Sequence, residues 1–233
     1  MKTEIIYEDK ELLVVRKPAG LATQTAKVVQ EDVVSELKNY LKNSYLGVVH
    51  RLDQPVEGLL VFAKTKRAAA ALSRELADGM LNKQYYAVIC GRPVEEQGEL
   101  VNYLYKDMLK TGRAVVVDEK ELSRCPDAKR AILQYRLLQY DEGQDISLME
   151  ITIDTGRFHQ IRAQMSHAGM ALLGDVKYSD ENTKKRALEL GVQYTALCAC
   201  CLDFMHPVKK RKMHFQIRPE GRVFLYFDLK KLC

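Results

Sequence analysis

The sequence lacks any apolar run that approaches the roughly 20 residues needed to cross a membrane as a helix. Its first residues, Met1-Lys2-Thr3-Glu4, also lack the apolar centre of a secretory signal peptide. No internal repeat and no linker-like segment is visible along the chain. We therefore expect a folded, cytoplasmic protein with no membrane association.

Cysteine occurs six times, but not in the pattern of a secreted disulfide framework. Cys198, Cys200 and Cys201 crowd one stretch and the others are scattered, so reduced thiols are expected. The spacing of this stretch and the following His206 fits none of the usual paired-ligand patterns of zinc sites. The sequence therefore predicts no metal ion.

The formal net charge is +5, a modest excess that permits nucleic-acid binding without proving it. The basic residues concentrate at Lys209-Lys210-Arg211-Lys212 and again at Lys64, Lys66 and Arg67. Each concentration fits either a solvated surface or a rim that contacts phosphates, and the sequence leaves both interpretations open.

Strand patterns outnumber helix patterns and often follow one another directly, which predicts an α+β fold with much antiparallel sheet. Residues 92–130 form a polar, irregular stretch in which hairpins or an excursion are expected. Helices are expected at about 31–43, 66–78, 159–168 and 180–190. Strands are expected within 4–16 and at 59–63, 85–90, 131–139, 146–153, 194–204, 212–217 and 223–227.

One carboxylate stands out, in the segment His50-Arg51-Leu52-Asp53, which precedes an apolar run. Residues 50–58 should form a loop, because aspartate is rare in strands and Pro55 cannot donate to a central ladder. Gly58 also tolerates backbone angles that other residues avoid. An aspartate at such a place is commonly a solvated or capping residue, so the segment alone makes Asp53 only a candidate.

The segment containing Asp53 resembles the His-Arg-Leu-Asp motif of the RNA pseudouridine synthases, in particular their ribosomal large subunit type A branch. Further segments resemble that family's motifs in the same order along nearly the whole chain. They are Lys17-Pro18-Ala19-Gly20-Leu21, Lys83-Gln84-Tyr85-Tyr86-Ala87, Gly156-Arg157-Phe158-His159-Gln160-Ile161-Arg162, Leu173-Gly174-Asp175 with Tyr178, and Ala196-Leu197 through Phe204-x-His206-Pro207.

The resemblance implies the pseudouridine synthase fold, a long, mixed and mostly antiparallel sheet bent around a central cleft with flanking helices. It implies one catalytic domain over residues 1–233. Only 16 residues precede Lys17, so the separate N-terminal S4-type RNA-binding domain of many relatives is not expected.

The implied activity is isomerisation of uridine to pseudouridine in structured rRNA or tRNA, without cofactor or metal. This chemistry needs a carboxylate at the ribose, a cation that keeps it charged, and a flat group that holds the loosened uracil. The resemblance assigns these roles to Asp53, Arg162 and Tyr85, with Arg162 paired to Asp53. Asp53 acts either as a nucleophile or as a base in a glycal route, and the sequence leaves both open.

The target uridine must leave its stack, at a cost of a few kcal/mol, and the resemblance assigns Arg51 to the vacated space. His50, His159 and Gln160 are assigned to substrate binding in the walls of the site. RNA is the only partner expected, and the protein is expected to be a monomer.

The sequence departs from the type A pattern at two places: Val56-Glu57 where Thr-Ser is usual, and Gln164 where many relatives have histidine. These departures leave the substrate preference open more than the reaction type. A first alternative is a noncatalytic RNA-binding module. If this alternative holds, at least one catalytic residue should be replaced by a residue that cannot perform its role. A second alternative is a glycosidic-bond hydrolase with Asp53 and Glu57 as paired carboxylates. The sequence does not identify which RNA or which uridine is modified.

Overall fold

A computed structural model of the protein describes residues 1–26, 30–42, 45–107, 111–117 and 119–231. The chain forms two compact units, Met1–Gln84 with Cys198–Glu220 and Tyr85–Leu197 with Gly221–Cys233. The predicted helix end at position 43 and the thiol of Cys233 lie outside the described residues. A single catalytic domain over residues 1–233 stays a prediction.

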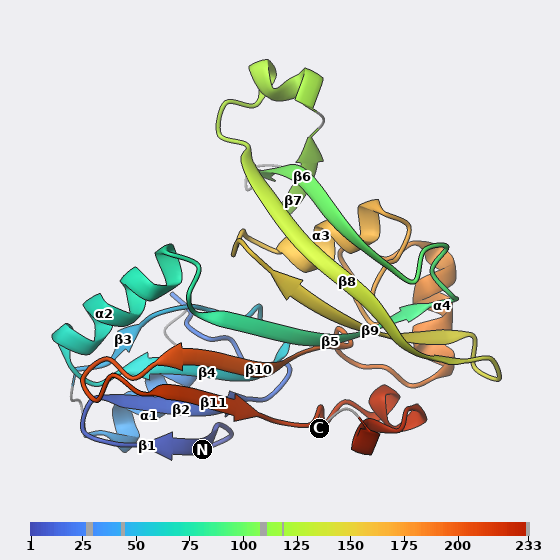
Figure 1. Cartoon of the computed structure of the whole chain (residues 1–233). Helices are drawn as coiled ribbons and strands as arrows, with labels where there is room; N and C mark the ends of the chain where they lie inside the picture. The colour runs from blue at the N-terminus through green and yellow to red at the C-terminus, as the bar shows by residue number, and fades with distance from the viewer. Residues whose placement is uncertain (27–29, 43–44, 108–110, 118, 232–233) are drawn as a thin grey trace. The chain divides into compact units, whose positions relative to one another are not determined.

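The first unit is built on strands β1 (Glu4–Glu8), β2 (Leu12–Lys17), β4 (Glu57–Ala63) and β10 (Leu197–Met205), in that order (Figure 1). Strand β3 (Gly47–Val48) pairs with β4, and β11 (Lys212–Gln216) pairs with β10. Strands β4 and β10 run parallel, whereas β1–β2, β2–β4, β3–β4 and β10–β11 are antiparallel. The mixed pairing confirms the predicted α+β class.

Both helices of the first unit begin where a polar side chain caps them. Helix α1 (Val33–Tyr40) follows Asp32, whose carboxylate accepts a hydrogen bond from the Ser35 backbone N–H at 2.7 Å. Helix α2 (Lys66–Ala77) follows Thr65, whose hydroxyl accepts from the Ala68 backbone N–H at 3.1 Å. Helix α2 packs on β4, as the sequence predicts.

Strand β4 is buried along its whole length, as expected for an apolar strand inside a sheet. It begins at Glu57, so the expectation of a loop through residue 58 was wrong by two residues. Those two residues pair in parallel with Cys198 and Ala199 of β10. Gly58 has φ +136°, and a Cβ there would lie 2.5 Å from the Ala199 backbone nitrogen. Only glycine fits this close approach of two backbones.

The second unit is built on β5 (Asn82–Cys90), β9 (Ile146–Ile153), β8 (Lys129–Asp141), β6 (Gln97–Asp107) and β7 (Arg113–Val117), in that order. The first three residues of β5 belong to the first unit. Strands β6 and β7 form an antiparallel pair (Figure 1), which confirms hairpin structure within residues 92–130. A 3-10 helix, Glu119–Arg124, follows β7.

Helix α3 (Gln160–His167) covers the β6–β7 pair through a small apolar core. Ala163 of the helix packs there with Leu104, Ala114 and Ala131. Helix α4 (Glu181–Glu189) follows, at the place where the sequence predicts a helix, and the carboxylate of Asp180 caps it. Within the part of the chain that the structure describes, no helix combines the length and the apolar character needed to cross a membrane.

The strand expected at residues 223–227 was wrong, because Arg222–Tyr226 is a 3-10 helix. The Phe224 backbone N–H donates to the Gly221 carbonyl at 3.0 Å, and the Phe227 N–H donates to the Phe224 carbonyl at 3.2 Å. Val223 and Phe224 are both buried although they are neighbours. A strand would direct these two side chains to opposite faces, whereas a tight helical turn buries both. A second such turn, Leu229–Lys231, follows.

Replacing Gly58 with alanine should destabilise the protein by about 3 kcal/mol or more, because the new Cβ adds both backbone strain and a clash with β10. Gly79 is the matched control, since it also has a positive φ of +70° but has open space around it. We expect Gly79→Ala to cost about 1 kcal/mol. Urea denaturation followed by circular dichroism measures both losses, and equal losses would contradict the close approach at Gly58.

Candidate active site

The loop that carries Asp53 is held against residues 20–24 by hydrogen bonds on both sides of that aspartate. The Thr23 hydroxyl accepts from the Leu52 backbone N–H at 3.1 Å and donates to the Leu52 carbonyl at 2.8 Å. The Gly20 N–H donates to the Gln54 carbonyl at 2.9 Å, and the Gln54 side chain donates back to the Gly20 carbonyl at 3.0 Å. The backbone before and after Asp53 is therefore fixed.

The buried side chain of Lys17 also holds this loop. Lys17 ends β2 and is 0% exposed, and its ammonium group donates to the carbonyl oxygens of Pro18, Leu21 and Gln54 at 3.0, 2.6 and 3.0 Å. Burial lowers the pKa of Lys17 to about 7, while the nearby carboxylates of Asp53 and Glu57 act in the opposite direction. Three carbonyl acceptors match the three N–H bonds of the ammonium form.

Asp53 is half-buried at the start of a turn in which the Val56 backbone N–H donates to the Asp53 carbonyl at 3.1 Å. The negative charge of its carboxylate offsets part of the cost of burying the Lys17 ammonium group. Because hydrogen bonds hold the loop on both sides, the backbone that carries this carboxylate is set before any ligand binds. Such preorganisation suits a group that must meet a reacting atom.

The two residues before Leu52 differ sharply in exposure. Arg51 is exposed, and its Nη2 donates to the Gln24 side chain at 2.8 Å. His50 is buried, and its Nε2 accepts from the Val61 backbone N–H at 3.2 Å. Burial and the charge of Lys83 lower the pKa of His50 to about 3, so its imidazole is neutral. It is therefore a packing group beside the loop, in keeping with a wall position.

Glu57 has a structural use in the first unit. It is buried in β4, and its Oε2 accepts a hydrogen bond from the Glu220 backbone N–H at 3.0 Å. This contact connects β4 to the end of the segment that follows β11. A hydrolase with Asp53 and Glu57 as an acid–base pair would need Glu57 facing a ligand, and its burial does not favour that alternative.

Tyr85 lies in β5 and is the first residue of the second unit. It is 5% exposed, so strand packing restricts its ring. This burial suits either a core tyrosine or a ring held ready for a stacked base. The stacking role of Tyr85 stays a prediction.

Arg162 forms a two-pronged ion pair with Asp175 inside the second unit. Its Nε and Nη2 donate to the two carboxylate oxygens of Asp175 at 2.6 and 2.7 Å, and the two side chains are 3% and 0% exposed. The Tyr178 ring lies 5.1 Å from the guanidinium carbon. The guanidinium plane is therefore fixed. The predicted pair between Arg162 and Asp53 stays a prediction.

Asp175 also organises the loop that follows it. The backbone N–H groups of Lys177 and Tyr178 donate to Asp175 Oδ1 at 3.0 and 3.2 Å. The Tyr178 hydroxyl accepts from the Ala114 backbone N–H at 2.7 Å and lies 2.8 Å from His159 Nδ1. The contact between the Tyr178 hydroxyl and Nδ1 holds the His159 ring in place.

His159 itself precedes α3 in a left-handed conformation with φ 51°, and its ring stacks on Phe158 at 3.7 Å between centroids. Gln160 begins the helix and is buried. The Gln160 Oε1 accepts from the Thr155 hydroxyl at 2.7 Å, and its Nε2 donates to the Ile132 carbonyl at 2.9 Å. Gln160 thus ties the start of α3 to β8, and a direct contact with substrate stays a prediction for both residues.

Gln164, one of the departures from the family pattern, is fully buried in α3. Its Nε2 donates to the Leu100 carbonyl and to the Asn102 side chain at 3.0 and 2.8 Å. Within the described residues its Oε1 is buried without a hydrogen-bond partner. Gln164 therefore holds α3 on β6, an interior role that does not require contact with RNA.

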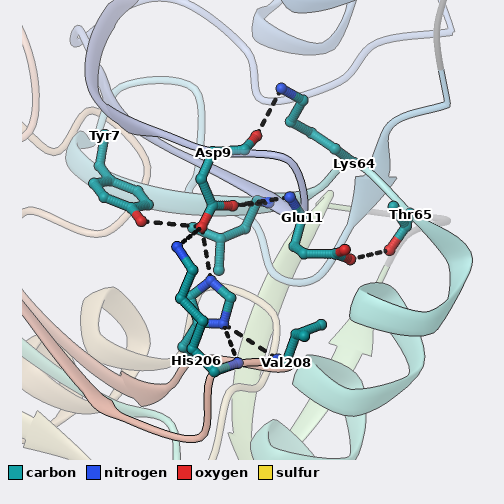
Figure 2. A network of polar contacts seen from close by, with 9 residues as sticks. Tyr7, Asp9, Glu11, Lys64, Thr65, His206 and Val208 are labelled. Atoms are coloured by element: carbon teal, nitrogen blue, oxygen red, sulfur yellow. Dashed lines mark hydrogen bonds and ion pairs between the residues drawn. The ribbon is translucent and has the colours of Figure 1, made fainter.

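The basic rim, meaning Lys64, Lys66, Arg67 and Lys209-Lys210-Arg211-Lys212, is partly engaged in internal ion pairs. Figure 2 shows the polar network around Asp9, to which Lys64 and His206 contribute. Lys209 lies 2.8 Å from Asp9 Oδ2, and Lys64 donates to Glu8 at 2.5 Å and to the Asp9 carbonyl at 2.8 Å. These two lysines fasten the turn between β1 and β2. The other residues of the basic rim are exposed, and these are the ones that could contact phosphates.

His206 is the buried centre of that network (Figure 2). Its Nδ1 accepts from the backbone N–H groups of Val208 and Lys209, so its Nε2 carries the hydrogen and donates to Asp9 at 2.8 Å. Burial raises the pKa of Asp9, but hydrogen bonds from Lys209, His206 and two backbone N–H groups outweigh it and leave the pKa well below its usual range. The ionised carboxylate holds the turn that follows β10.

Two residues important to this geometry received no role from the sequence. Lys17 was visible only as the first residue of a turn motif, and Asp175 only as part of a Leu-Gly-Asp segment. A charged residue next to an otherwise apolar strand end was the available signal for Lys17. Asp175 had no local signal, because its partner is 13 residues earlier in the chain.

Comparison with known proteins agrees with the resemblance of the motifs. Residues 11–167 match the family described as RNA pseudouridylate synthase. The ribosomal large subunit pseudouridine synthase D of Zymomonas mobilis is 34% identical, over 97% of this chain and 72% of that protein. The tRNA pseudouridine synthase C of Haemophilus ducreyi is 29% identical, over 91% of this chain and 89% of that protein.

Other relatives are longer than this chain. The ribosomal large subunit pseudouridine synthase C of Rickettsia conorii is 34% identical over 76% of this chain, and the match spans 56% of that protein. Among solved structures, human RNA pseudouridylate synthase domain containing 1 superposes with a TM-score of 0.76 at 18% identity. That superposition covers 93% of this chain and 83% of the human one, and it confirms the predicted fold. The chain belongs to the RNA pseudouridylate synthase family.

Proposed function

We propose that this protein converts specific uridines to pseudouridine in structured RNA, with Asp53 as the essential carboxylate. The observation that carries the proposal is the family match over residues 11–167, which includes Asp53, Tyr85 and Arg162. All three predicted catalytic residues are intact. The noncatalytic alternative predicts that one of these three residues is replaced, so it has no support from the sequence.

In the proposed mechanism, Asp53 acts at the ribose while the glycosidic bond to uracil breaks. The carboxylate either attacks carbon 1 or removes the carbon 2 proton, and both routes end with a bond from uracil carbon 5 to the ribose. Support comes from the loop, whose backbone is fixed on both sides of Asp53 and underlain by Lys17. A carboxylate held in place does not have to be ordered when the substrate arrives.

Arg162 is proposed to keep Asp53 ionised and oriented during the reaction. The two hydrogen bonds that it donates to Asp175 fix the plane of its guanidinium group, which is the condition for a directional pair with a second carboxylate. Asp175 is then a positioning residue that acts through Arg162. This role explains why a buried aspartate occurs in the loop after α3.

Tyr85 is proposed to stack on the uracil while the base turns, and its hydroxyl to assist removal of the carbon 5 proton. Its burial in β5 reduces the rotamer freedom that would be lost on stacking. Arg51 is proposed to fill the stack that the flipped uridine leaves, and its exposure at the surface of the loop suits that role. His50, His159 and Gln160 are proposed as wall residues.

The proposed substrate class is rRNA or tRNA. Support comes from the names of the relatives, which refer to the ribosomal large subunit and to tRNA. The net charge of +5 and the exposed part of the basic rim are compatible with phosphate contacts. A monomeric, cytoplasmic enzyme that needs no cofactor or metal for this reaction is part of the same proposal.

Replacing Asp53 with asparagine should reduce pseudouridine formation on the order of 10²–10⁴-fold or more, because the amide can neither attack nor accept a proton. Carbodiimide labelling of total rRNA and tRNA incubated with the enzyme measures the product. Asp78→Asn, which changes an exposed aspartate of the same unit, is the matched control and should retain full activity. Full activity of the Asp53 variant would contradict the proposed role.

A wild-type protein that leaves no labelled uridine in either RNA class would overturn the proposed activity. If such a protein still bound RNA in a filter-binding assay, the noncatalytic alternative would be supported instead. Release of free uracil without pseudouridine would point to the hydrolase alternative. The three outcomes are distinguished by one reaction, analysed for label, bound RNA and free base.

Asp175→Asn should destabilise the second unit by roughly 3–5 kcal/mol, because it removes the buried carboxylate that accepts two hydrogen bonds from the Arg162 guanidinium group. Urea denaturation measures the loss. The exposed pair between Arg136 and Glu150 is the control, and Arg136→Gln should cost less than about 1 kcal/mol. A loss at Asp175 no larger than this control would contradict a supporting role of the buried pair.

A further inference from the structure

Three side chains with metal-binding atoms meet on one face of the β10–β11 pair, within the first unit. Cys201 and Asp203 are two residues apart on β10, so both point to the same face. His214 of β11 lies directly opposite Asp203 in the antiparallel register. The mechanism proposed above uses none of these three residues.

The ligand atoms of the three side chains are close together. His214 Nδ1 lies 2.6 Å from Asp203 Oδ1, and Cys201 Sγ lies 3.7 Å from His214 Nδ1 and 3.9 Å from Asp203 Oδ2. In a tetrahedral zinc site, neighbouring ligand atoms are roughly 3.3–3.6 Å apart, given metal–ligand distances of about 2.0–2.3 Å. Small side-chain rotations therefore convert the cluster into one face of such a tetrahedron.

We propose that Cys201, Asp203 and His214 bind one divalent transition-metal ion of the zinc class. The ligands would be the Cys201 sulfur, His214 Nδ1 and one oxygen of Asp203, with solvent in the fourth position. Thiolate and imidazole select borderline or soft ions such as Zn²⁺ and Co²⁺ over Mg²⁺ and Ca²⁺, which prefer oxygen ligands. The cluster matches that preference, because two of its three ligand atoms are sulfur and nitrogen.

Exposure allows an ion to enter and leaves room for solvent as the fourth ligand. The His214 and Asp203 side chains are 61% and 44% exposed, whereas Cys201 is 7% exposed. Solvent therefore reaches the cluster from the side of His214, whereas the Cys201 side is buried. A site with three protein ligands and one solvent position has the arrangement of an open zinc centre.

Metal binding would release a proton from Cys201. On binding, the S–H bond breaks, the sulfur–metal bond forms, and the proton leaves to solvent. The hydrogen shared between His214 and Asp203 moves by exchange with water to the exposed imidazole Nε2.

This cluster differs from the cysteine pattern that the sequence suggests. Cys198 and Cys200 alternate with Cys201 along β10, so they point to the other face. His206 donates to Asp9 and is held by backbone N–H groups. The sequence separates His214 from Cys201 by 13 residues, and only the register of β10 and β11 brings them together.

Cobalt titration of the 233-residue chain, kept reduced with a phosphine, tests the proposal. Co²⁺ should bind with a stoichiometry of one and give a near-ultraviolet thiolate-to-cobalt band with strong visible bands of four-coordinate cobalt. Zn²⁺ should displace it and raise the melting temperature by roughly 5 °C at saturation.

Cys201→Ser should abolish the charge-transfer band, and His214→Gln should weaken binding at least roughly tenfold. His214 is mostly exposed, so its variant should fold normally, which circular dichroism checks. Cys125→Ser changes a cysteine of the second unit and is the matched control that should keep the band. A wild-type protein without the band, or a band that survives in Cys201→Ser, would overturn the proposal. Pseudouridine formation by these variants is a separate readout, so failure of the metal site leaves the proposed activity unaffected.

Discussion

Three carbonyl oxygens surround the fully buried ammonium group of Lys17, and the candidate site depends on this interaction more than on any other. A lysine without water is costly unless it is hydrogen-bonded and near opposite charge. The carbonyls of Leu21 and Gln54 supply the bonds, and Asp53 supplies charge. The same contact that makes the buried lysine tolerable therefore also fixes the loop that carries Asp53.

The second unit uses a comparable device at Arg162. There the buried cation meets a carboxylate, Asp175, whose other bonds order the loop leading to Tyr178. In both units a buried charge fixes a segment that has no regular secondary structure of its own. Functional loops need such internal supports, because their backbones are not held by helix or sheet bonds.

Much of the fold followed from local patterns. The apolar run after Gly58 predicted a buried strand, and the helix patterns at 66–78 and 180–190 predicted α2 and α4. The prediction for residues 223–227 was wrong. Aromatic and branched residues favour strands, but burying both Val223 and Phe224 requires a tight helical turn. The start of β4 was also predicted two residues too late. Gly58 is typical of a loop, but here it allows the backbones of β4 and β10 to approach closely.

Sequence by itself determined the family, the α+β class and the candidate residues, because ordered motifs and hydrophobic periodicity are properties of neighbouring residues. Only the tertiary structure decided which charges are buried and what they hold: Lys17 beneath the Asp53 loop, Asp175 on Arg162, and His214 beside Cys201. These contacts join residues that are distant in the chain. Their energies depend on burial and register, which exist only once the strands have paired.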